Sequence, residues 1–149
     1  MIKITNKNFS IDKIISKLKT KKAGCIVSFL GIVRGYSQNG KEKVTCLKFE
    51  THKEMALKKL SEIEKSAKKN FDIADIAIIH RIGKFSVSEN IVLIAVSAKN
   101  RKEAFPACEY IINELKKVVP IWKKEVTEKG EYWVENDTRF CSNTLEIYY

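Results

Sequence analysis

The apolar residues of this chain change spacing several times, between the two-residue alternation of strands and the three-to-four-residue spacing of helices. In order, these segments are typical of a strand, a helix, two strands, a helix, two strands, a helix and two strands. Strands that follow one another directly favour hairpin-like pairing, whereas a doubly wound parallel sheet needs a helix between its strands. We therefore predict an α+β domain, a mostly antiparallel sheet with three covering helices.

The first half of the chain contains the clearest strand pattern. Residues Ile2 to Thr5 alternate, and Ser10 is placed to cap a helix whose apolar residues fall on one face. The stretch from Ala23 to Val33 is rich in Ile, Val and Phe, and a second alternating run extends from Lys43 to Glu50. We expect these two runs to pair as a hairpin, which would leave Arg34 at a strand end beside a flexible loop.

Two longer helices and four strands are expected in the second half. They are a helix over Glu54–Asn70, strands over Ile73–Ile82 and Ile91–Ala98 separated by the loop Gly83–Asn90, a helix that begins at Arg101, and a hairpin of Ile121–Thr127 and Glu131–Val134. Residues expected to face inward are Met55, Leu57, Leu60, Ile63 and Ala67 on one helix, Ala104, Cys108, Ile111, Leu115 and Val118 on the other, and Trp133 in the hairpin.

The length of the chain bounds its domain organisation. A chain of 149 residues with 44% hydrophobic residues has the size of one ordinary domain and can bury a core without disulfides or metals. We predict that residues 1–134 form a single catalytic domain. Residues 135–149 have no clear period, so we predict a C-terminal tail that is either ordered over a dimer or partly disordered.

The formal net charge of +10 attracts anions, among them nucleic acids, phosphorylated metabolites, acidic proteins and membrane surfaces, without choosing between them. Of the 28 basic residues, 24 are lysines and four are arginines: Arg34, Arg81, Arg101 and Arg139. Because bidentate recognition of phosphate favours arginine, these four are the more informative residues. A non-enzymatic basic domain that binds nucleic acid stays open as an alternative, although no RNA-binding motif accompanies the charge.

Metal or familiar cofactor chemistry is not indicated. The four cysteines include no Cys-x-x-Cys pair, and the two histidines, His52 and His80, lack metal-ligand spacing. No dinucleotide-binding, Walker-type or Gly-x-Ser-x-Gly motif occurs. Most of the cysteines fall in apolar patterns, which fits a reducing compartment, and no membrane span or signal-peptide core is evident. We therefore predict a cytoplasmic protein with no cofactor, no metal and no membrane association.

Candidate functional residues gather in Leu115–Glu125, where a helix ends, Pro120 breaks it and a strand begins. Lys116 should lie in the last helical turn and Lys123 just after the break, so both ammonium groups can converge on one pocket. A lysine partly desolvated beside Trp122 and other cations has a lowered pKa, which suits a nucleophile or a proton-transfer group. In a chain so rich in lysine, a pair of merely solvated lysines is the alternative.

Arginines extend this candidate anion site. At a strand end, Arg34 is either an anion contact or a surface arginine of a hairpin. Arg101 begins the third long helix, where the helix dipole adds to the attraction for an anion. Arg101 and Lys116 then lie at opposite ends of one helix, so they cannot touch one phosphate unless a second chain or a loop joins them. This separation indicates a dimer.

Short motifs between about Gly24 and Glu135 match one known family in their order and spacing. They are Val27-Ser28-Phe29-Leu30-Gly31-Ile32-Val33-Arg34, Ile79-His80-Arg81-Ile82-Gly83, Arg101 with Ala104-Phe105, Leu115-Lys116, Pro120-Ile121-Trp122-Lys123-Lys124-Glu125 and Trp133-Val134-Glu135. With these motifs the chain resembles the large, catalytic subunit of molybdopterin synthase. The resemblance implies an α+β fold of the α/β-hammerhead-like type.

The activity implied by the resemblance is that of a sulfurtransferase, which inserts two sulfurs into cyclic pyranopterin monophosphate and forms the dithiolene of molybdopterin. The implied donor is a small ubiquitin-like sulfur-carrier subunit with a C-terminal Gly-Gly thiocarboxylate, and the implied assembly is a homodimer within a heterotetramer. Pterin phosphate and thiocarboxylate are both anions, which agrees with a cationic pocket, and no nucleic acid or metal is implied. A subunit that only docks the ubiquitin-like partner is a further alternative.

The resemblance also assigns roles to individual positions. Lys116 matches the lysine closest to the carrier tail, and Lys123 matches a second essential lysine that assists proton transfer or substrate placement. Arg34 and Arg101 match arginines that hold the phosphate or the pterin of the substrate. Phe29 matches an aromatic residue near the tail, and a core position is its alternative.

Two positions depart from the family pattern. Asn100 stands where many relatives have a histidine just before the arginine, and asparagine can hydrogen-bond a substrate but cannot carry a proton at neutral pH. Asp137 stands where some relatives have an arginine, and Arg139 could substitute for it. We therefore expect Asn100 to bind substrate without acid–base chemistry.

Overall fold

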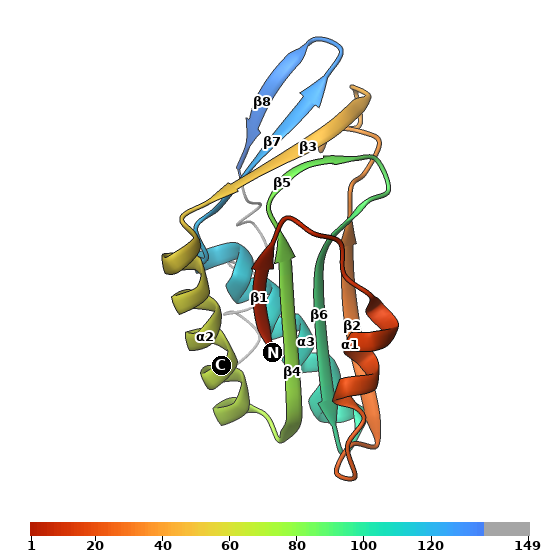
Figure 1. Ribbon diagram of the computed structural model, residues 1–149, viewed down its shortest axis with the longest axis vertical. Helices are drawn as coiled ribbons and strands as arrows, with labels where there is room; N and C mark the ends of the chain where they lie inside the picture. Colours follow the sequence, from red (N-terminus) through yellow and green to blue (C-terminus); the bar gives the residue numbers. More distant parts are fainter. Residues whose placement is uncertain (136–149) are drawn as a thin grey trace, which may run out of the picture.

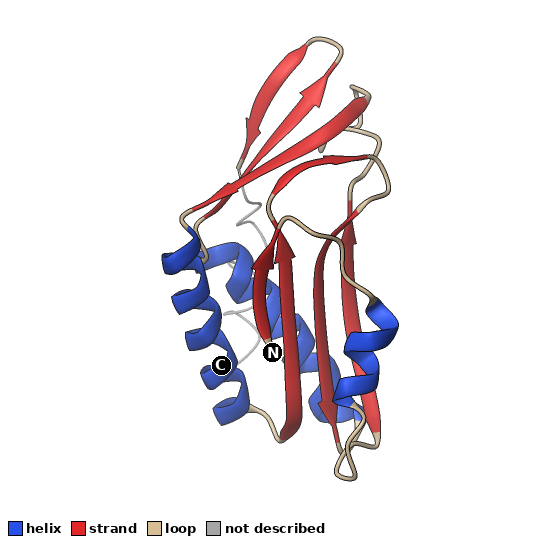
Figure 2. Ribbon diagram, viewed as in Figure 1, coloured by secondary structure: helices blue, strands red, loops and turns tan. Residues whose placement is uncertain are grey.

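The computed structural model describes residues 1–135, which fold into helices and strands arranged in layers (Figure 1). In chain order the elements are β1 (Ile2–Thr5), α1 (Ile11–Leu18), β2 (Cys25–Ile32), β3 (Val44–Thr51), α2 (Lys53–Asn70), β4 (Ile73–Arg81), β5 (Gly83–Ser86), β6 (Asn90–Ala98), α3 (Arg101–Val118), β7 (Ile121–Thr127) and β8 (Gly130–Val134). The predicted α+β class is confirmed, but the strands form two four-stranded sheets instead of one (Figure 2). Nearly all of the predicted tail, residues 136–149, lies outside the described residues.

The first sheet has the strand order β1-β4-β6-β2 and is covered on both faces. Strands β4, β6 and β2 are antiparallel neighbours, and β1 alone runs parallel to β4. Helices α2 and α3 cover one face, and α1 lies on the other (Figure 1). Because both faces are buried, β4 and β6 are almost continuously apolar instead of alternating with polar residues.

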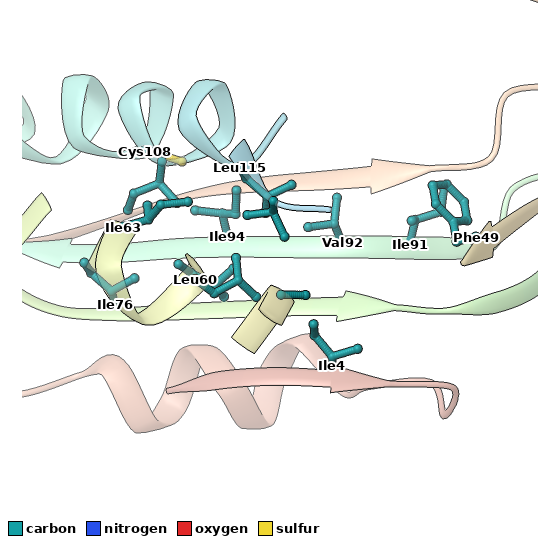
Figure 3. Close-up of a cluster of buried hydrophobic side chains, with 14 of the residues drawn as sticks. Ile4, Phe49, Leu60, Ile63, Ile76, Ile91, Val92, Ile94, Cys108 and Leu115 are labelled. Atoms are coloured by element: carbon teal, nitrogen blue, oxygen red, sulfur yellow. The ribbon is translucent and has the colours of Figure 1, made fainter. Parts of the chain in front are cut away.

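Successive side chains of these strands enter two separate cores. Ile76 and Ile78 of β4 contribute to the cluster beneath α2 and α3, together with Leu60 and Ile94 (Figure 3). Ala77 and the other residues of opposite parity join the smaller cluster under α1. The alternation therefore gives each face of the first sheet its own apolar core, one under the short helix and one under the two long helices.

The second sheet, β5-β3-β7-β8, lies at one end of the first (Figure 1). The predicted hairpin of β2 and β3 is wrong, because β2 pairs with β6 and β3 pairs with β5 and β7. The connection from Val33 to Lys43 carries the chain from one sheet to the other, and an isolated bridge between Tyr36 and Lys43 is what remains of the expected pairing. The hairpin of β7 and β8 is confirmed.

Several local predictions are corrected by the packing. Strand β5 occupies the segment predicted as a loop, and it pairs with β3. Met55 is 51% exposed, because the buried stripe of α2 begins one residue later, at Ala56. Val118 also faces solvent, and Val119, just beyond the helix end, is buried instead. The first helix is capped as predicted, since the Ser10 side chain accepts a hydrogen bond from the Lys13 N–H.

Candidate active site

Lys116 and Lys123 line one pocket at the junction of α3 and β7. Helix α3 ends at Val118, Pro120 follows, and β7 begins at Ile121, so the chain reverses over a few residues. The pocket has a volume of about 450 Å³. Its lining residues are Lys116, Lys117, Ile121, Trp122, Lys123, Trp133, Val134 and Glu135. The predicted convergence of the two lysines is therefore present in one chain.

Lys123 has the electrostatic environment expected of a reactive lysine. Burial of its ammonium group lowers the pKa of Lys123, and the positive charges of Lys116 and Arg34 lower that pKa further. The carboxylate of Glu125 opposes them and raises the pKa of Lys123. The net direction is downward, so Lys123 gives up its proton more readily than an ordinary lysine.

Strand parity separates Lys123 from its neighbour Lys124. Lys123 lies opposite Phe49 of β3, on the same face as the buried Glu125, whereas Lys124 points to the other face. There the ammonium group of Lys124 lies 3.4 Å from a carboxylate oxygen of Glu131 and 4.3 Å from the centre of the Trp133 ring. Lys124 is therefore a control for Lys123 that differs in environment but not in residue type.

Arg34 lies just beyond the end of β2, on the exposed surface. Its Nε donates a hydrogen bond to the Tyr36 carbonyl at 2.9 Å, which fixes one edge of the guanidinium. Arg34 is not among the residues that line the pocket, but its charge reaches Lys123 and lowers the pKa there. The structure therefore brings together three predicted site residues, Arg34, Lys116 and Lys123.

Arg101 and Asn100 lie at the opposite end of α3, as predicted. Arg101 is the first residue of the helix, and at 1.5 Å per residue it lies about 22 Å along the axis from Lys116. The Asn100 side chain caps the helix, because its Oδ1 accepts a hydrogen bond from the Lys102 N–H at 3.1 Å. Within one chain, neither residue reaches the lysine pocket.

Phe29 lies in the middle of β2, which is an edge strand of the first sheet. Its side chain is 36% exposed, so it is not a core residue. It is not among the residues that line the pocket either.

The sequence patterns missed several residues of the site. Glu125 lies two residues after Lys123, and in a strand this spacing alone places both side chains on one face. Trp133 was predicted to pack but is 57% exposed; it is among the residues that line the pocket, and the Lys124 ammonium group lies over its ring. Lys117 also lines the pocket, and it lies 3.9 Å from a carboxylate oxygen of Glu114.

Two further features concern residues 1–135 only. No helix in this part of the chain is long and apolar enough to cross a membrane. Over the same residues, no group of three or more His, Cys, Asp or Glu side chains is arranged to hold a metal ion.

The fold and the pocket define a class of protein: an α+β domain that gathers lysines and tryptophans between a helix end and a strand, as suits an enzyme of anionic substrates. The chain belongs to the MoaE protein family, whose sequence pattern matches residues 4–118. This range includes Phe29, Arg34, Asn100, Arg101 and Lys116 and ends before Lys123. The family inferred from the motifs is therefore confirmed.

Individual relatives match over most of the chain. The molybdopterin synthase catalytic subunit of Pyrococcus abyssi is 46% identical over 130 residues, which are 87% of this chain and 86% of that protein. The subunit of the same name from Bacillus subtilis is 41% identical over 131 residues, or 88% of this chain and 82% of that protein. The crystal structure of molybdopterin synthase from Staphylococcus aureus superposes with a TM-score of 0.82 at 35% identity, covering 88% of this chain and 94% of that one.

Proposed function

We infer that this chain is the catalytic subunit of a molybdopterin synthase and thus an enzyme of molybdopterin biosynthesis. Its membership of the MoaE protein family and its similarity to catalytic subunits from Pyrococcus abyssi and Bacillus subtilis support this function. The matches cover most of the length of both relatives, so the similarity is not limited to a shared fragment.

The reaction that we propose is the transfer of two sulfurs to cyclic pyranopterin monophosphate, which forms the dithiolene of molybdopterin. The donor is a small ubiquitin-like subunit whose C-terminal Gly-Gly carries a thiocarboxylate. The observation that carries this proposal is the convergence of Lys116 and Lys123 on one pocket, within reach of the charge of Arg34. A thiocarboxylate and a phosphate are both anions, and both are stabilised by such a group of cations.

Lys116 and Lys123 are proposed to have different roles. In each transfer the thiocarboxylate sulfur forms a bond to a substrate carbon, while the bond from that carbon to an oxygen breaks. Water then cleaves the acyl–sulfur bond and releases the carrier as a carboxylate. We propose that Lys116 orients the thiocarboxylate and that Lys123, with its lowered pKa, gives a proton to the departing oxygen.

Arg34, Arg101, Asn100 and Phe29 are proposed substrate and carrier contacts. Arg34 would hold the phosphate or the pterin beside the lysines. Because Arg101 and Asn100 lie at the far end of α3, they would act in the pocket of a second copy, in a homodimer within a heterotetramer. The exposed Phe29 would contact the carrier tail, likewise through the assembly.

A single-turnover experiment tests this function. The protein is mixed with a thiocarboxylated Gly-Gly carrier and cyclic pyranopterin monophosphate, and the product is analysed by mass for two added sulfurs. We expect Lys116→Ala and Lys123→Ala to lower the rate at least roughly a hundredfold, because each removes a group that acts on the reacting atoms. Lys124→Ala is the matched control and should keep the native rate, since its side chain lies on the other face of β7.

The outcomes separate the remaining alternatives. Sulfur transfer with equal rates in all three variants would refute the assigned roles. A native protein that binds the carrier but yields no product would be a docking subunit and not an enzyme. Binding that follows the length of a nucleic acid, and not the presence of a free Gly-Gly tail, would indicate a nucleic-acid-binding domain.

A further inference from the structure

The cross-strand neighbour of Lys123 is an aromatic residue of the core. Phe49 of β3 lies directly opposite Lys123 of β7, and residues opposed in this way share one face with their β-carbons about 4.5–5.5 Å apart. Phe49 is 8% exposed and belongs to the main hydrophobic cluster. The position of Phe49 therefore helps to set where the stem of Lys123 emerges from the strand.

Phe49 is held between the two sheets by other rings. Its ring meets the edge of the His80 ring, with the centroids 5.4 Å apart and the planes at 68°. On the β5 side it packs against the Phe85 ring at 6.3 Å. His80 belongs to the first sheet, and Phe49 lies at the end of the core beside Ile91 (Figure 3). This aromatic contact therefore joins the sheet that carries Lys123 to the sheet beneath it.

Arg81 fixes the outer end of this row of rings. Its guanidinium carbon lies 4.2 Å from the centre of the Phe85 ring. Its Nη1 donates to the Asn90 carbonyl at 2.8 Å and lies 3.4 Å from the carboxylate of Glu89, and its Nη2 donates to the Asn6 carbonyl at 3.5 Å. These partners lie at the ends of the first sheet, so Arg81 connects Phe85 to several segments at once.

The burial of Arg81 is energetically demanding. Its side chain is 7% exposed, and among the described residues Arg81 Nε is the one fully buried side-chain nitrogen or oxygen without a hydrogen-bond partner. A buried cation with an unsatisfied donor loses hydration that its contacts only partly replace, whereas apolar residues of similar volume are often neutral or stabilising at such sites. Stability alone therefore does not account for an arginine at this position. A role in fixing the position of the neighbouring rings accounts for it.

We propose that Arg81 is a positioning residue for the sulfur-transfer reaction: through Phe85 and Phe49 it fixes the strand position from which Lys123 enters the active site. This inference rests on the function proposed above. Arg81 touches no reacting atom, so its removal acts on the placement of Lys123 and not on the chemistry directly. A displacement of about 1 Å at a catalytic group can lower a rate about a hundredfold.

The test compares Arg81→Met, which keeps much of the side-chain volume, with Lys48→Met on β3. Lys48 follows the opposite face of the same sheet and pairs with Glu131, so its removal leaves the row of rings intact. For Arg81→Met we expect the single-turnover rate at saturating substrate, corrected for the folded fraction, to fall at least roughly tenfold, with substrate affinity unchanged. Lys48→Met should keep the native rate.

A second measurement does not depend on activity. The rate at which acetic anhydride labels Lys123 is followed against pH by peptide mass. The charged groups that act on Lys123, namely Lys116, Arg34 and Glu125, are unchanged in Arg81→Met. We therefore expect any movement of its labelling midpoint to report a change in the burial or position of Lys123, and we expect that midpoint to rise towards that of an ordinary lysine.

The results that would overturn the proposal are specific. A native rate per folded molecule, together with a native labelling midpoint, would make Arg81 a stabilising residue only. If Arg81→Met does not fold, Phe85→Leu replaces it, because this change keeps the hydrogen bonds of Arg81 but removes the ring between it and Phe49. Native values in Phe85→Leu would equally overturn the proposal. A native sulfur-transfer rate in Lys123→Ala would instead refute the proposed function. The labelling of Lys123 in Arg81→Met would then still show whether Arg81 positions this lysine.

Discussion

The buried imidazole of His80 should make the stability of this protein depend on pH in a predictable way. His80 is 4% exposed at the end of β4, and burial lowers its pKa to about 4, although a hydrogen bond to the Arg81 carbonyl opposes this. Because a carbonyl oxygen only accepts hydrogen bonds, His80 Nδ1 must carry the proton and donate at 2.7 Å. The folded protein therefore holds a neutral imidazole, with Nδ1 protonated.

The direction and size of the effect follow from the two protonation states. In the unfolded chain His80 titrates at its ordinary pKa of 6.5, so between pH 6.5 and about pH 4 the unfolded state binds a proton that the folded state does not. The stabilising contribution is therefore complete above about pH 6.5 and is lost as the pH falls towards about 4. For these two values the full loss is about 3 kcal/mol, of which about 2 kcal/mol is lost by pH 5.

The assay is urea unfolding of the native protein and of His80→Asn, each at about pH 7.5 and at about pH 5. Asparagine keeps a donor for the Arg81 carbonyl but does not titrate, so its pH-dependent loss of unfolding free energy should be about 2 kcal/mol smaller than that of the native protein. Each protein is compared with itself at the two pH values. The ring packing lost in His80→Asn and the carboxylate contributions common to both proteins therefore cancel in the difference. Equal losses in the native protein and His80→Asn would refute a neutral, buried His80.

Three other predictions concern separate parts of the molecule. Gly24→Ala should destabilise the protein by about 1–3 kcal/mol, because its new β-carbon would lie 2.2 Å from a backbone oxygen, whereas Gly35→Ala meets its nearest side-chain atom at 3.5 Å and should be nearly neutral in the same urea titration. Arg34→Met should raise the pKa of Lys123, seen as a higher pH midpoint of acylation; an unchanged midpoint would show that its charge does not reach the lysine. Burial raises the pKa of Cys108 to about 11, so its thiol should react slowly with iodoacetamide at about pH 8 in the folded protein and rapidly in urea; equal rates would contradict its burial.

Local sequence signals predicted the helices well because their determinants lie within a few residues of one another. Ser10 caps the first helix through the N–H three residues later, and Arg101 begins the third helix directly after a capping asparagine. The error at Met55 is also confined to one turn: Leu60, Ile63 and Ala67 are buried as predicted, and Ala56 faces the core in place of Met55. Such errors shift boundaries without changing the elements.

The pairing of strands could not be predicted in this way. β2 and β3 are adjacent in sequence and both apolar, but their partners are fixed by segments far along the chain, namely β6 and β7. The missed strand β5 has only four residues, and Phe85 is its one buried residue, so it carries almost no periodic signal. This segment is a strand because it pairs with β3, and not because its own residues favour a strand.

The candidate site shows the same division between local and long-range information. The end of α3, Pro120 and the start of β7 are local, and they placed Lys116 and Lys123 correctly in one pocket. The difference between Lys123 and Lys124 depends on which face of β7 is buried, and the pairing of β7 with β3 decides this. Without that partner, the two neighbouring lysines are equivalent in sequence.

The two pocket lysines belong to different layers of the fold, and this has a consequence for how the site is maintained. Lys116 is carried by α3, which packs on the first sheet, whereas Lys123 is carried by the second sheet. The link between them is held by the Thr51 hydroxyl, which donates to the Pro120 carbonyl at 2.7 Å, and by the burial of Val119. The separation of the two ammonium groups is therefore set by the packing of one layer on the other. Residues that fix this packing control the electrostatics of the site without lining it.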